Sequence, residues 1–174
     1  MSYTIIRNAK YKRENLMAVY RHNERKNKNY SNKDIDRTKT HLNYSLKDLE
    51  FNYVKEFDNI IKKYNLKRQI KTVSNIVCEY KDLGEKYILS AKVHYDEKPP
   101  HLHLLFLPVV HTTDKKGNPI DKLACSEFWK AKYSYRQLQN TFFNYMVANG
   151  FDLQRGLPKE ETNRNHCSIE EYKK

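Results

Sequence analysis

Residues 86–111 have the sequence KYILSAKVHYDEKPPHLHLLFLPVVH, which predicts two strands joined by a tight turn. Aliphatic, β-branched and aromatic residues dominate Lys86–Tyr95 and His101–His111, as they do in half-buried strands. Residues 96–100, Asp-Glu-Lys-Pro-Pro, are polar and contain two prolines, which favours a short and rigid connection. We therefore expect these residues to form a β-hairpin.

Three histidines lie beside the turn of this hairpin. His101 and His103 are two residues apart on one strand, so both point to the same face, and the turn brings His94 to that face as well. Three imidazoles bind a divalent metal and leave positions open for a substrate, where the metal polarises a phosphoryl oxygen as a Lewis acid. The sequence therefore predicts a metal site at these three residues.

Two carboxylates stand between the histidines in the sequence. Glu97 is a candidate to hydrogen-bond an imidazole or to act as a general base, and Asp96 is a candidate to support the site from behind the ligands. The alternative is that both are ordinary turn residues of a charged loop. Imidazoles alone do not choose the metal, because they suit zinc, copper, nickel or iron, whereas a phosphoryl-transfer enzyme also runs on manganese or magnesium.

Outward from the hairpin, the residue pattern predicts the remaining elements of one domain over 1–174. Further strands are expected at Tyr3–Arg7, at His41–Leu46 and near Ile120–Cys125, and helices at Arg13–Lys26, Phe51–Asn65, Ile70–Leu83 and Ser134–Asn149. Glycines follow two of these helices, at Gly84 and Gly150. This order favours an α+β fold with a mostly antiparallel sheet and helices packed on it.

The first predicted helix has one buried face and a histidine beside it. Leu16, Tyr20 and Asn23 recur at helical spacing and define the buried face. At 100° per residue, His22 lies about 120° from the direction of Leu16, so it flanks the buried stripe. In the last helix, the residues expected to face inward are Leu138, Phe142, Tyr145 and Met146.

The chain is strongly basic. It contains 33 Lys and Arg against 21 Asp and Glu, which gives a formal net charge of +12 and a pI of about 9.5. Residues 1–40 hold eleven of these cations and only four acidic residues, interleaved with tyrosines. Cations meet phosphates while aromatic rings stack on bases, so the composition favours a nucleic-acid partner. The alternative is a basic surface without such a partner.

The cysteines and the apolar runs predict a cytoplasmic protein. The three cysteines, Cys78, Cys125 and Cys167, form no C-x-x-C pair and are expected to be reduced thiols. The longest apolar stretch, Leu102–Val110, is interrupted and far too short to span a bilayer. We expect no membrane contact from this segment.

The histidine-rich turn also carries a family resemblance. His94–His103 follows the pattern H-x-D-E-x-x-P-H-x-H, which resembles the metal motif of the Mob/Pre (MobV) plasmid relaxases of the HUH endonuclease superfamily. Four further segments look like motifs of that family in the right order: Arg21–Arg25, Ser31–Ile35, His41–Tyr44 and Gly150–Gly156. The stretch between Asn65 and Lys86 is shorter than the family pattern, which has an additional strand and a longer helix there.

The resemblance implies a metal-dependent enzyme that nicks one DNA strand at a plasmid origin of transfer, stays joined to the 5′ end and later rejoins the strand. The family nucleophile, a histidine that forms a phosphoramidate, maps onto His22, with Glu97 to orient it or take its proton. A free imidazole has a pKa of about 6.5 and is mostly neutral at pH 7.5, whereas a phenol with a pKa of about 10 must first lose its proton. Tyr44 and Tyr20 remain rival nucleophiles.

The resemblance also suggests the cofactor and the partners. Manganese or magnesium is the expected metal, with zinc or nickel as alternatives. The expected partner is single-stranded or hairpin DNA at the origin. The candidate contacts to this DNA are Arg25, Lys33, Arg37, Asn43 and Tyr44. The alternative for each of them is an ordinary surface side chain without a role in binding. Because family members continue beyond this domain, 1–174 is expected to be the N-terminal part of a longer protein, with homodimerisation through a region absent here.

Three rival functions remain open from the sequence. A rolling-circle replication initiator of the same superfamily would share the metal chemistry. A DNA-binding repressor would use the metal structurally, so that chelation would lower its folding stability and not an activity. A three-histidine enzyme acting on a small molecule fits the charge of +12 poorly.

Overall fold

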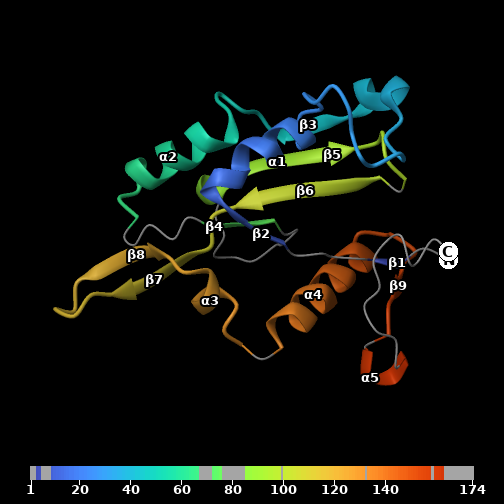
Figure 1. The fold of residues 1–174 in the computed structure, drawn as a ribbon. Helices are drawn as coiled ribbons and strands as arrows, with labels where there is room; N and C mark the ends of the chain where they lie inside the picture. The colour runs from blue at the N-terminus through green and yellow to red at the C-terminus, as the bar shows by residue number, and fades with distance from the viewer. Residues whose placement is uncertain are drawn as a thin grey trace. The chain divides into compact units, whose positions relative to one another are not determined.

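A computed structural model describes residues 3–4, 9–66, 72–75, 85–98, 100–131, 133–157 and 159–162. The chain divides into two compact units, a larger one of residues Ile6–Ser134 and a smaller one of Met1–Ile5 together with Tyr135–Lys174 (Figure 1). The histidine-rich turn belongs to the larger unit. No helix of the described residues is long and apolar enough to cross a membrane.

A five-stranded antiparallel sheet forms the larger unit. Its strands lie in the order β2 (Ala9–Lys12), β4 (Thr72–Asn75), β6 (His101–Phe106), β5 (Ile88–His94) and β3 (Tyr44–Lys47). Each neighbouring pair is antiparallel, and the predicted hairpin is β5–β6 at the centre of the sheet. The α+β prediction with a mostly antiparallel sheet is therefore confirmed.

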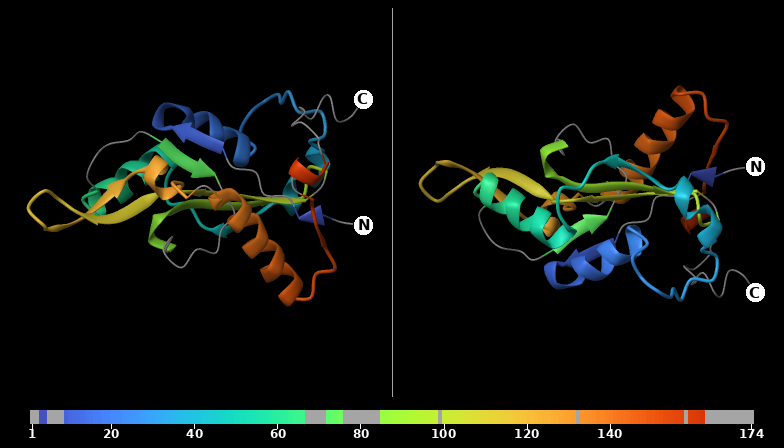
Figure 2. Two further views of the ribbon diagram at one scale, coloured as in Figure 1. Left: turned by 90° about the horizontal axis from the view of Figure 1, so that it is seen from below. Right: turned by 90° about the horizontal axis from the view of Figure 1, so that it is seen from above.

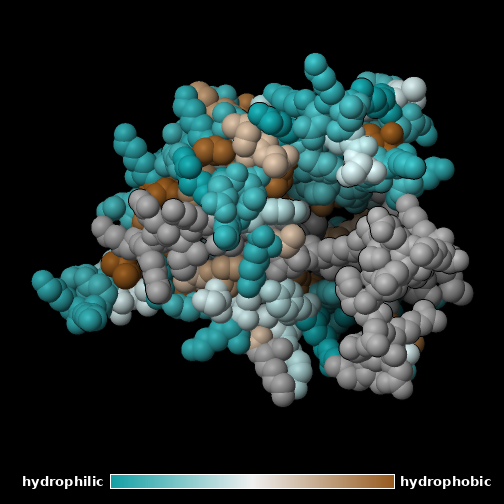
Figure 3. All heavy atoms as spheres, viewed as in Figure 1, coloured by the Kyte–Doolittle hydropathy of each residue, from teal (hydrophilic) through white to brown (hydrophobic). Residues whose placement is uncertain are grey.

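Helices α1 (Leu16–Asn23) and α2 (Tyr53–Lys63) pack together over the core, and a 3-10 turn, η1 (Arg13–Asn15), precedes α1. Helix α2 begins at Asn52, whose side-chain oxygen accepts from the backbone N–H groups of residues 54 and 55. The core cluster combines residues of both helices with residues of the sheet: Leu16, Tyr53, Phe57, Ile60, Leu66, Tyr87, Leu89, Leu105, Leu107, Val109 and Leu123. The face drawn in Figure 3 is predominantly hydrophilic, with apolar residues in small separate patches.

The prediction of a helix over Ile70–Leu83 is wrong where the structure describes it. Residues Thr72–Asn75 form β4, the strand between β2 and β6, and the rest of that stretch, with Gly84, lies outside the described residues. Apolar residues three and four apart suit a helix, but in so short a run this spacing does not distinguish a helix from a buried strand. The β-branched Thr72 and Val73 favour the extended form.

The predicted strand His101–His111 is in fact two strands. Strand β6 ends at Phe106, and after Pro108 the chain enters β7 (Val109–Thr113), which pairs with β8 (Pro119–Leu123) in a separate hairpin that projects from the sheet (Figure 2). Proline has no backbone N–H to donate to a ladder, so it marks the break. The remaining elements of this unit are the 3-10 turn η3 (Glu85–Tyr87) and the short helix α3 (Cys125–Phe128).

Two N-terminal predictions need smaller corrections. In His41–Leu46 only the second half is extended, because Arg37–Leu42 forms the 3-10 helix η2, capped at its start by the side chain of Asp36. Of the strand predicted at Tyr3–Arg7, β1 (Tyr3–Thr4) is described, and it pairs in parallel with β9 (Gln154–Arg155) in the smaller unit. Strand β2 was not predicted.

The smaller unit contains α4 (Ser134–Ala148), the predicted last helix, and α5 (Lys159–Thr162). Leu138 is buried as expected. Tyr145 is 44% exposed, so the prediction that its side chain faces inward is wrong. Gly150 follows the end of α4 and has a φ of +86°, the left-handed conformation that glycine adopts without strain.

Candidate metal centre and catalytic site

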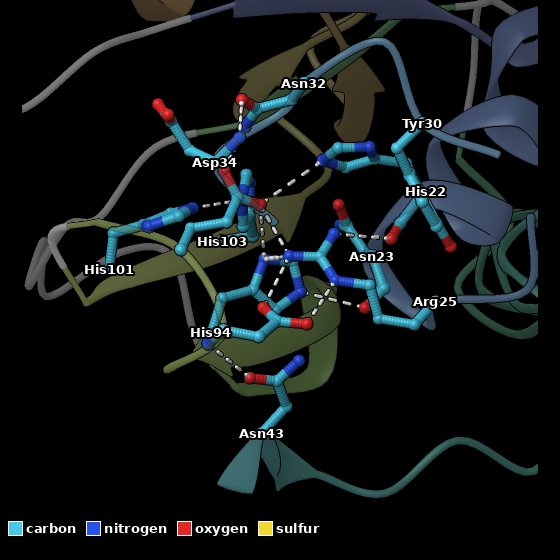
Figure 4. A network of polar contacts seen from close by, with 12 residues as sticks. His22, Asn23, Arg25, Tyr30, Asn32, Asp34, Asn43, His94, His101 and His103 are labelled. Atoms are coloured by element: carbon cyan, nitrogen blue, oxygen red, sulfur yellow. Dashed lines mark hydrogen bonds and ion pairs between the residues drawn. The ribbon is translucent and has the colours of Figure 1, made fainter. Parts of the chain in front are cut away.

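The register of the central hairpin brings the three histidines to one face. His94 lies directly opposite His101, and His103 lies opposite Lys92, on the same side of the sheet. One ligand nitrogen from each histidine lies within 4.8 Å of the others, and the Nε2 atoms of His101 and His103 are 2.9 Å apart. Figure 4 shows the three rings turned toward one another. The predicted convergence of these side chains is therefore what the fold produces.

His94 is fixed by helix α1. Its ring is fully buried, with Nε2 at 2.8 Å from the backbone oxygen of Asn23 and Nδ1 at 3.1 Å from Nη2 of Arg25. A carbonyl oxygen only accepts and a guanidinium only donates, so Nε2 carries the proton and Nδ1 keeps the lone pair. Asn23 is itself 2% exposed, which explains why a polar residue stands on the buried face of this helix.

The chemistry of these donors fits a divalent metal. Burial, and to a smaller extent the neighbouring His94 and His101, lower the pKa of His103 to about 3. The ring is thus neutral at physiological pH, as metal ligation requires. A second group within the same distance limit consists of His94, Asp96 and Glu97. The residues present could hold a metal on three imidazoles with carboxylates close by.

Arg25 joins the end of α1 to the turn after β5. Its Nε and Nη2 atoms donate to the two carboxylate oxygens of Asp96 at 2.8 and 2.7 Å, and Nη2 also donates to Glu97 at 2.5 Å. Thr40 donates a further hydrogen bond to Asp96 at 2.9 Å. The three side chains of Arg25, Asp96 and Glu97 are 6%, 0% and 12% exposed, so this is a buried ionic network.

The two carboxylates are held in their charged forms. Burial alone raises the pKa of each group, but hydrogen bonds outweigh burial, and the pKa of Asp96 lies well below its usual range because of Arg25 above all. For Glu97, the neighbouring His94 ring and the hydrogen bond from Arg25 lower the pKa to about 2. Charged carboxylates at these positions balance the cation that Arg25 buries.

The backbone of Arg25 has an unusual conformation. Helix α1 ends in a Schellman motif, in which Lys26 N–H donates to Arg21 O at 2.8 Å and Arg25 N–H donates to His22 O at 3.2 Å. Arg25 occupies the left-handed position of this motif with a φ of +54°. Helix α2 has an asparagine, Asn65, at the same position. An arginine there is strained by about 1 kcal/mol relative to glycine, and such strain is typical of functional sites.

His22 stands at the edge of the histidine group. Its ring centroid is 6.2 Å from that of His94 and 6.1 Å from that of His103, both in edge-to-face geometry. Its Nε2 atom lies 4.0 Å from Glu97 Oε1, and the side chain is 38% exposed. Burial lowers the pKa of His22, and the charge of Arg25 lowers it further. An accessible, neutral imidazole therefore faces the candidate metal site.

A polar network under α1 sets the position of the helix on the sheet. Glu24 accepts from Lys92 Nζ and from the Tyr53 hydroxyl, both at 3.0 Å. Lys92 also donates to Ser45 at 3.0 Å, and the Tyr53 hydroxyl lies 2.9 Å from the Ser90 hydroxyl. Burial raises the pKa of Tyr53 well above its usual range, so its hydroxyl stays protonated. The network therefore connects Glu24, which lies between Asn23 and Arg25, to strands β3 and β5.

The two tyrosines considered as rival nucleophiles lie elsewhere. Tyr44 pairs with Val93 across β3 and β5, and side chains alternate along a strand, so Tyr44 lies on the sheet face opposite His94. Its ring stacks on that of Tyr95 at 6.1 Å. Tyr20 is about 200° around α1 from His22 and packs edge-on against Tyr53 at 5.2 Å.

The predicted DNA contacts have varied surroundings. Asn43 accepts from the backbone N–H groups of Tyr95 and Asp96 at 2.7 and 3.2 Å and thus shapes the turn. Arg37 donates to the backbone oxygens of Asn27 and Lys28. Lys33 is exposed.

Two site residues were not foreseen from the sequence. Asn32 donates to Glu97 Oε2 at 2.7 Å, and the ring of Tyr30 stands 5.9 Å from that of His22 (Figure 4). Both lie in an irregular loop, where no periodicity indicates the direction of a side chain. Asn32 lies within the motif Ser31–Ile35, and Asn23 and Glu24 lie within the motif Arg21–Arg25; the resemblance indicated both motifs without giving these residues roles.

The fold and site define a protein with three converging histidines that could hold a metal on an antiparallel sheet, and a further histidine on helix α1 beside them. The family profile of the plasmid recombination enzymes (Mob_Pre) matches residues 1–81 and 78–174. The chain belongs to this family. The two matched segments meet within the stretch that is short relative to the family pattern.

Named relatives support this assignment. The plasmid recombination enzyme type 1 of Staphylococcus aureus is 33% identical over an alignment of 206 positions, which covers 100% of this chain and 49% of the relative. The plasmid recombination enzyme of Lactiplantibacillus plantarum is 31% identical, with coverages of 99% and 54%. The chain thus spans about half the length of the curated relatives it matches.

Solved structures of the MobM relaxase domain (MOBV; Mob_Pre) share the fold. One, a Mn-bound crystal structure at pH 6.8 with plasmid pMV158 oriT DNA, superposes with a TM-score of 0.75 at 26% identity, covering 99% of this chain and 98% of that domain. Another, determined at pH 5.5, gives a TM-score of 0.71 at 27% identity, with the same coverages.

Proposed function

We propose that this chain is the DNA-nicking relaxase domain of a plasmid mobilisation protein, which cleaves and rejoins one strand at an origin of transfer. The observation that carries the proposal is the placement of His22, edge-on to two of the three histidines that form the candidate metal site. A nucleophile beside a divalent-metal site suits transfer of a phosphodiester, and the net charge of +12 suits a DNA substrate. Similarity to DNA-bound MobM domains supports the same function.

We further propose that His94, His101 and His103 hold a manganese or magnesium ion, manganese being the metal in the MobM domain structures. When bound, the metal polarises the non-bridging oxygens of the scissile phosphate and offsets the charge that develops on them. Zinc and nickel also bind imidazole sites and are alternatives.

His22 is the proposed nucleophile. The unprotonated ring nitrogen of a neutral His22 forms a bond to phosphorus while the bond from phosphorus to the 3′ oxygen breaks. The other ring nitrogen then gives up its proton to water and the 3′ oxygen takes one from water, which leaves a 5′-phosphoramidate and a free 3′ hydroxyl. Rejoining reverses these changes, so no nucleotide cofactor is needed. The lowered pKa of His22 and its exposure support this role, and the positions of Tyr20 and Tyr44 away from the site disfavour them.

Glu97 and Arg25 are proposed to organise this nucleophile. Glu97 is held from one side by Arg25 and from the other by Asn32, so its carboxylate has a fixed position 4.0 Å from His22. Its low pKa makes Glu97 a weak base, and orientation of His22 is therefore the role that its geometry supports. Arg25 donates to both Asp96 and Glu97, so we propose that other cations contact the scissile phosphate.

The DNA contacts and the wider protein are also proposals. Single-stranded or hairpin DNA would meet the loop after α1, where Lys33 and Arg37 are exposed, and Tyr44 offers an exposed ring for base stacking. The alignment of the MobM domain with 99% of this chain supports one nicking domain over 1–174. A longer cytoplasmic protein with a dimerising C-terminal region would account for the half-length match to the relatives.

A covalent-adduct assay tests the proposed function. Purified chain is mixed with the labelled 22-nucleotide pMV158 origin strand, and separately with circular single-stranded DNA of random sequence, with manganese or with a chelator, and run on denaturing gels. We expect an acid-labile protein–DNA adduct only with manganese, while the melting temperature of the chelated protein changes little. Loss of fold on chelation without any adduct on either DNA would favour a DNA-binding repressor with a structural metal.

A further inference from the structure

Tyr30 lies beside the proposed nucleophile, His22. Its ring centroid lies 5.9 Å from that of His22, at an interplanar angle of 72°. Edge-to-face pairs at such distances are attractive. His22 therefore has three ring neighbours among the described residues, His94, His103 and Tyr30, and the first two are candidate metal ligands.

The His22 ring depends on these packing contacts for its orientation. In the described part of the chain, the nearest polar partner of the ring is Glu97, whose Oε1 lies 4.0 Å from Nε2, which is beyond hydrogen-bond distance. The side chain is also 38% exposed, so solvent offers it other rotamers. A partly exposed ring without a direct hydrogen bond keeps one orientation only if its neighbours are themselves rigid.

Tyr30 is rigid by this criterion. Its hydroxyl oxygen accepts from the backbone N–H of Asn27 at 3.0 Å. The guanidinium carbons of Arg25 and Arg37 each lie 5.6 Å from the centroid of its ring. Cations close to an aromatic ring are attracted to its π system, so two arginines, both fixed by other bonds, hold the ring in place.

The loop that carries Tyr30 is tied to the metal-motif turn. Asp36 N–H donates to the backbone oxygen of Asp96 at 2.7 Å, and the side chain of Asn32 donates to Glu97 at 2.7 Å. Arg37 closes the loop on itself through the backbone oxygens of Asn27 and Lys28. Residues 27–37 thus connect the ring beside His22 to the same turn that places Glu97 (Figure 4).

We propose that Tyr30 is a positioning residue for His22: the ring of Tyr30 holds the imidazole of His22 toward the metal site. The inference rests on the proposed function, because it assigns His22 the attack on phosphorus. Misorientation of a nucleophile slows the chemical step while leaving substrate binding intact. A ring that instead stacked on a DNA base would mainly affect affinity.

The test uses Tyr30→Ala and Tyr30→Phe, with Tyr133→Ala as a matched control at a tyrosine that is 56% exposed. Single-turnover adduct formation at saturating DNA gives the rate, and binding without metal gives the Kd, both on the strand that the wild-type chain nicks. We expect Tyr30→Ala to lower the rate by about 10-fold with the Kd changed less than about twofold. Tyr30→Phe keeps the ring and both arginine contacts but loses the hydrogen bond from Asn27, so its rate should lie between those of the wild type and Tyr30→Ala. Tyr133→Ala should stay within about twofold of wild type.

A rate for Tyr30→Ala equal to that of Tyr133→Ala, or a weakened Kd with an unchanged rate, would overturn the inference. NMR of the His22 ring protons provides the readout that does not need catalysis. We expect one set of His22 ring signals with contacts to the ring of residue 30 in the wild type and in Tyr30→Phe, and averaged signals in Tyr30→Ala. If the wild type forms no adduct, the proposed function fails, and these signals still decide whether Tyr30 orients His22.

Discussion

The two ends of helix α1 are held by arginines with the same chemistry and different surroundings. Before the helix, Arg13 binds Asp58 of α2 through two nitrogens, with side chains 41% and 48% exposed. After the helix, Arg25 binds Asp96 in the same bidentate way, with side chains 6% and 0% exposed. Only the second arginine also has a strained backbone, with a φ of +54°.

This difference distinguishes an ion pair that only attaches a helix to its neighbour from one that organises a site. An exposed ion pair gains little, because water and salt screen it and two long side chains lose freedom. A buried pair fixes geometry, but its removal leaves a charge without a partner in a poor solvent. Between these extremes lies the pair of Lys92 and Glu24, with side chains 15% and 13% exposed. The three pairs thus form a series in burial around one helix.

Breaking the buried end should have the largest effect. Arg25→Ala leaves Asp96 and Glu97 buried without their main donor, and we expect the free energy of unfolding to fall by about 3–5 kcal/mol. Urea denaturation at neutral pH measures this. Arg25→Gly relieves the left-handed strain of about 1 kcal/mol, so it should be less destabilised than Arg25→Ala. A loss below about 1 kcal/mol in both variants would mean that the network is not needed for folding.

The middle pair should give an intermediate loss. Lys92→Ala removes the donor from a half-buried Glu24 and from Ser45, and we expect about 1–3 kcal/mol by the same denaturation. Lys92→Met keeps most of the aliphatic stem and serves as the control for packing. If Lys92→Ala were more destabilising than Arg25→Ala, the ranking by burial would be wrong.

The exposed end should matter least. Arg13→Ala is expected to lower the free energy of unfolding by about 0.2–1 kcal/mol, and the difference from wild type should shrink further at about 1 M salt. Paired denaturation curves at low and high salt provide the measurement. A loss as large as that of Arg25→Ala would show that the two ends of the helix do not differ in the way their burial suggests.

The sequence predicted the part of the site that local geometry determines. Alternation along a strand places His101 and His103 on one face, and the two-proline turn brings His94 to the same face. The group of three histidines that could hold a metal was therefore predictable from residues 94–103 alone. Helical spacing likewise placed His22 beside the buried stripe of α1, where it is found. The bounds of α2 were also close to those predicted, because its apolar face repeats regularly.

What the sequence did not reveal depends on contacts between distant residues. Arg25 was expected to meet DNA, whereas its partners Asp96 and Glu97 lie about seventy positions away and become neighbours only through the fold. Strand β4 was mistaken for a helix because β pairing with β2 and β6 outweighs a short apolar repeat. Tyr30 lies in a loop whose path is set by bonds to the metal-motif turn.

The identity of the nucleophile is the most direct test of the account. Trypsin separates the three candidates, because cleavage after Arg13, Arg21, Arg25, Lys39 and Lys47 places Tyr20, His22 and Tyr44 in peptides 14–21, 22–25 and 40–47. The wild-type adduct would be trimmed with nuclease, digested near pH 8 to preserve a phosphoramidate, and analysed by mass spectrometry. We predict that the nucleotide mass appears on peptide 22–25, and that His22→Ala forms no adduct. A nucleotide on peptide 14–21 or 40–47, or an adduct that persists in His22→Ala, would contradict the account.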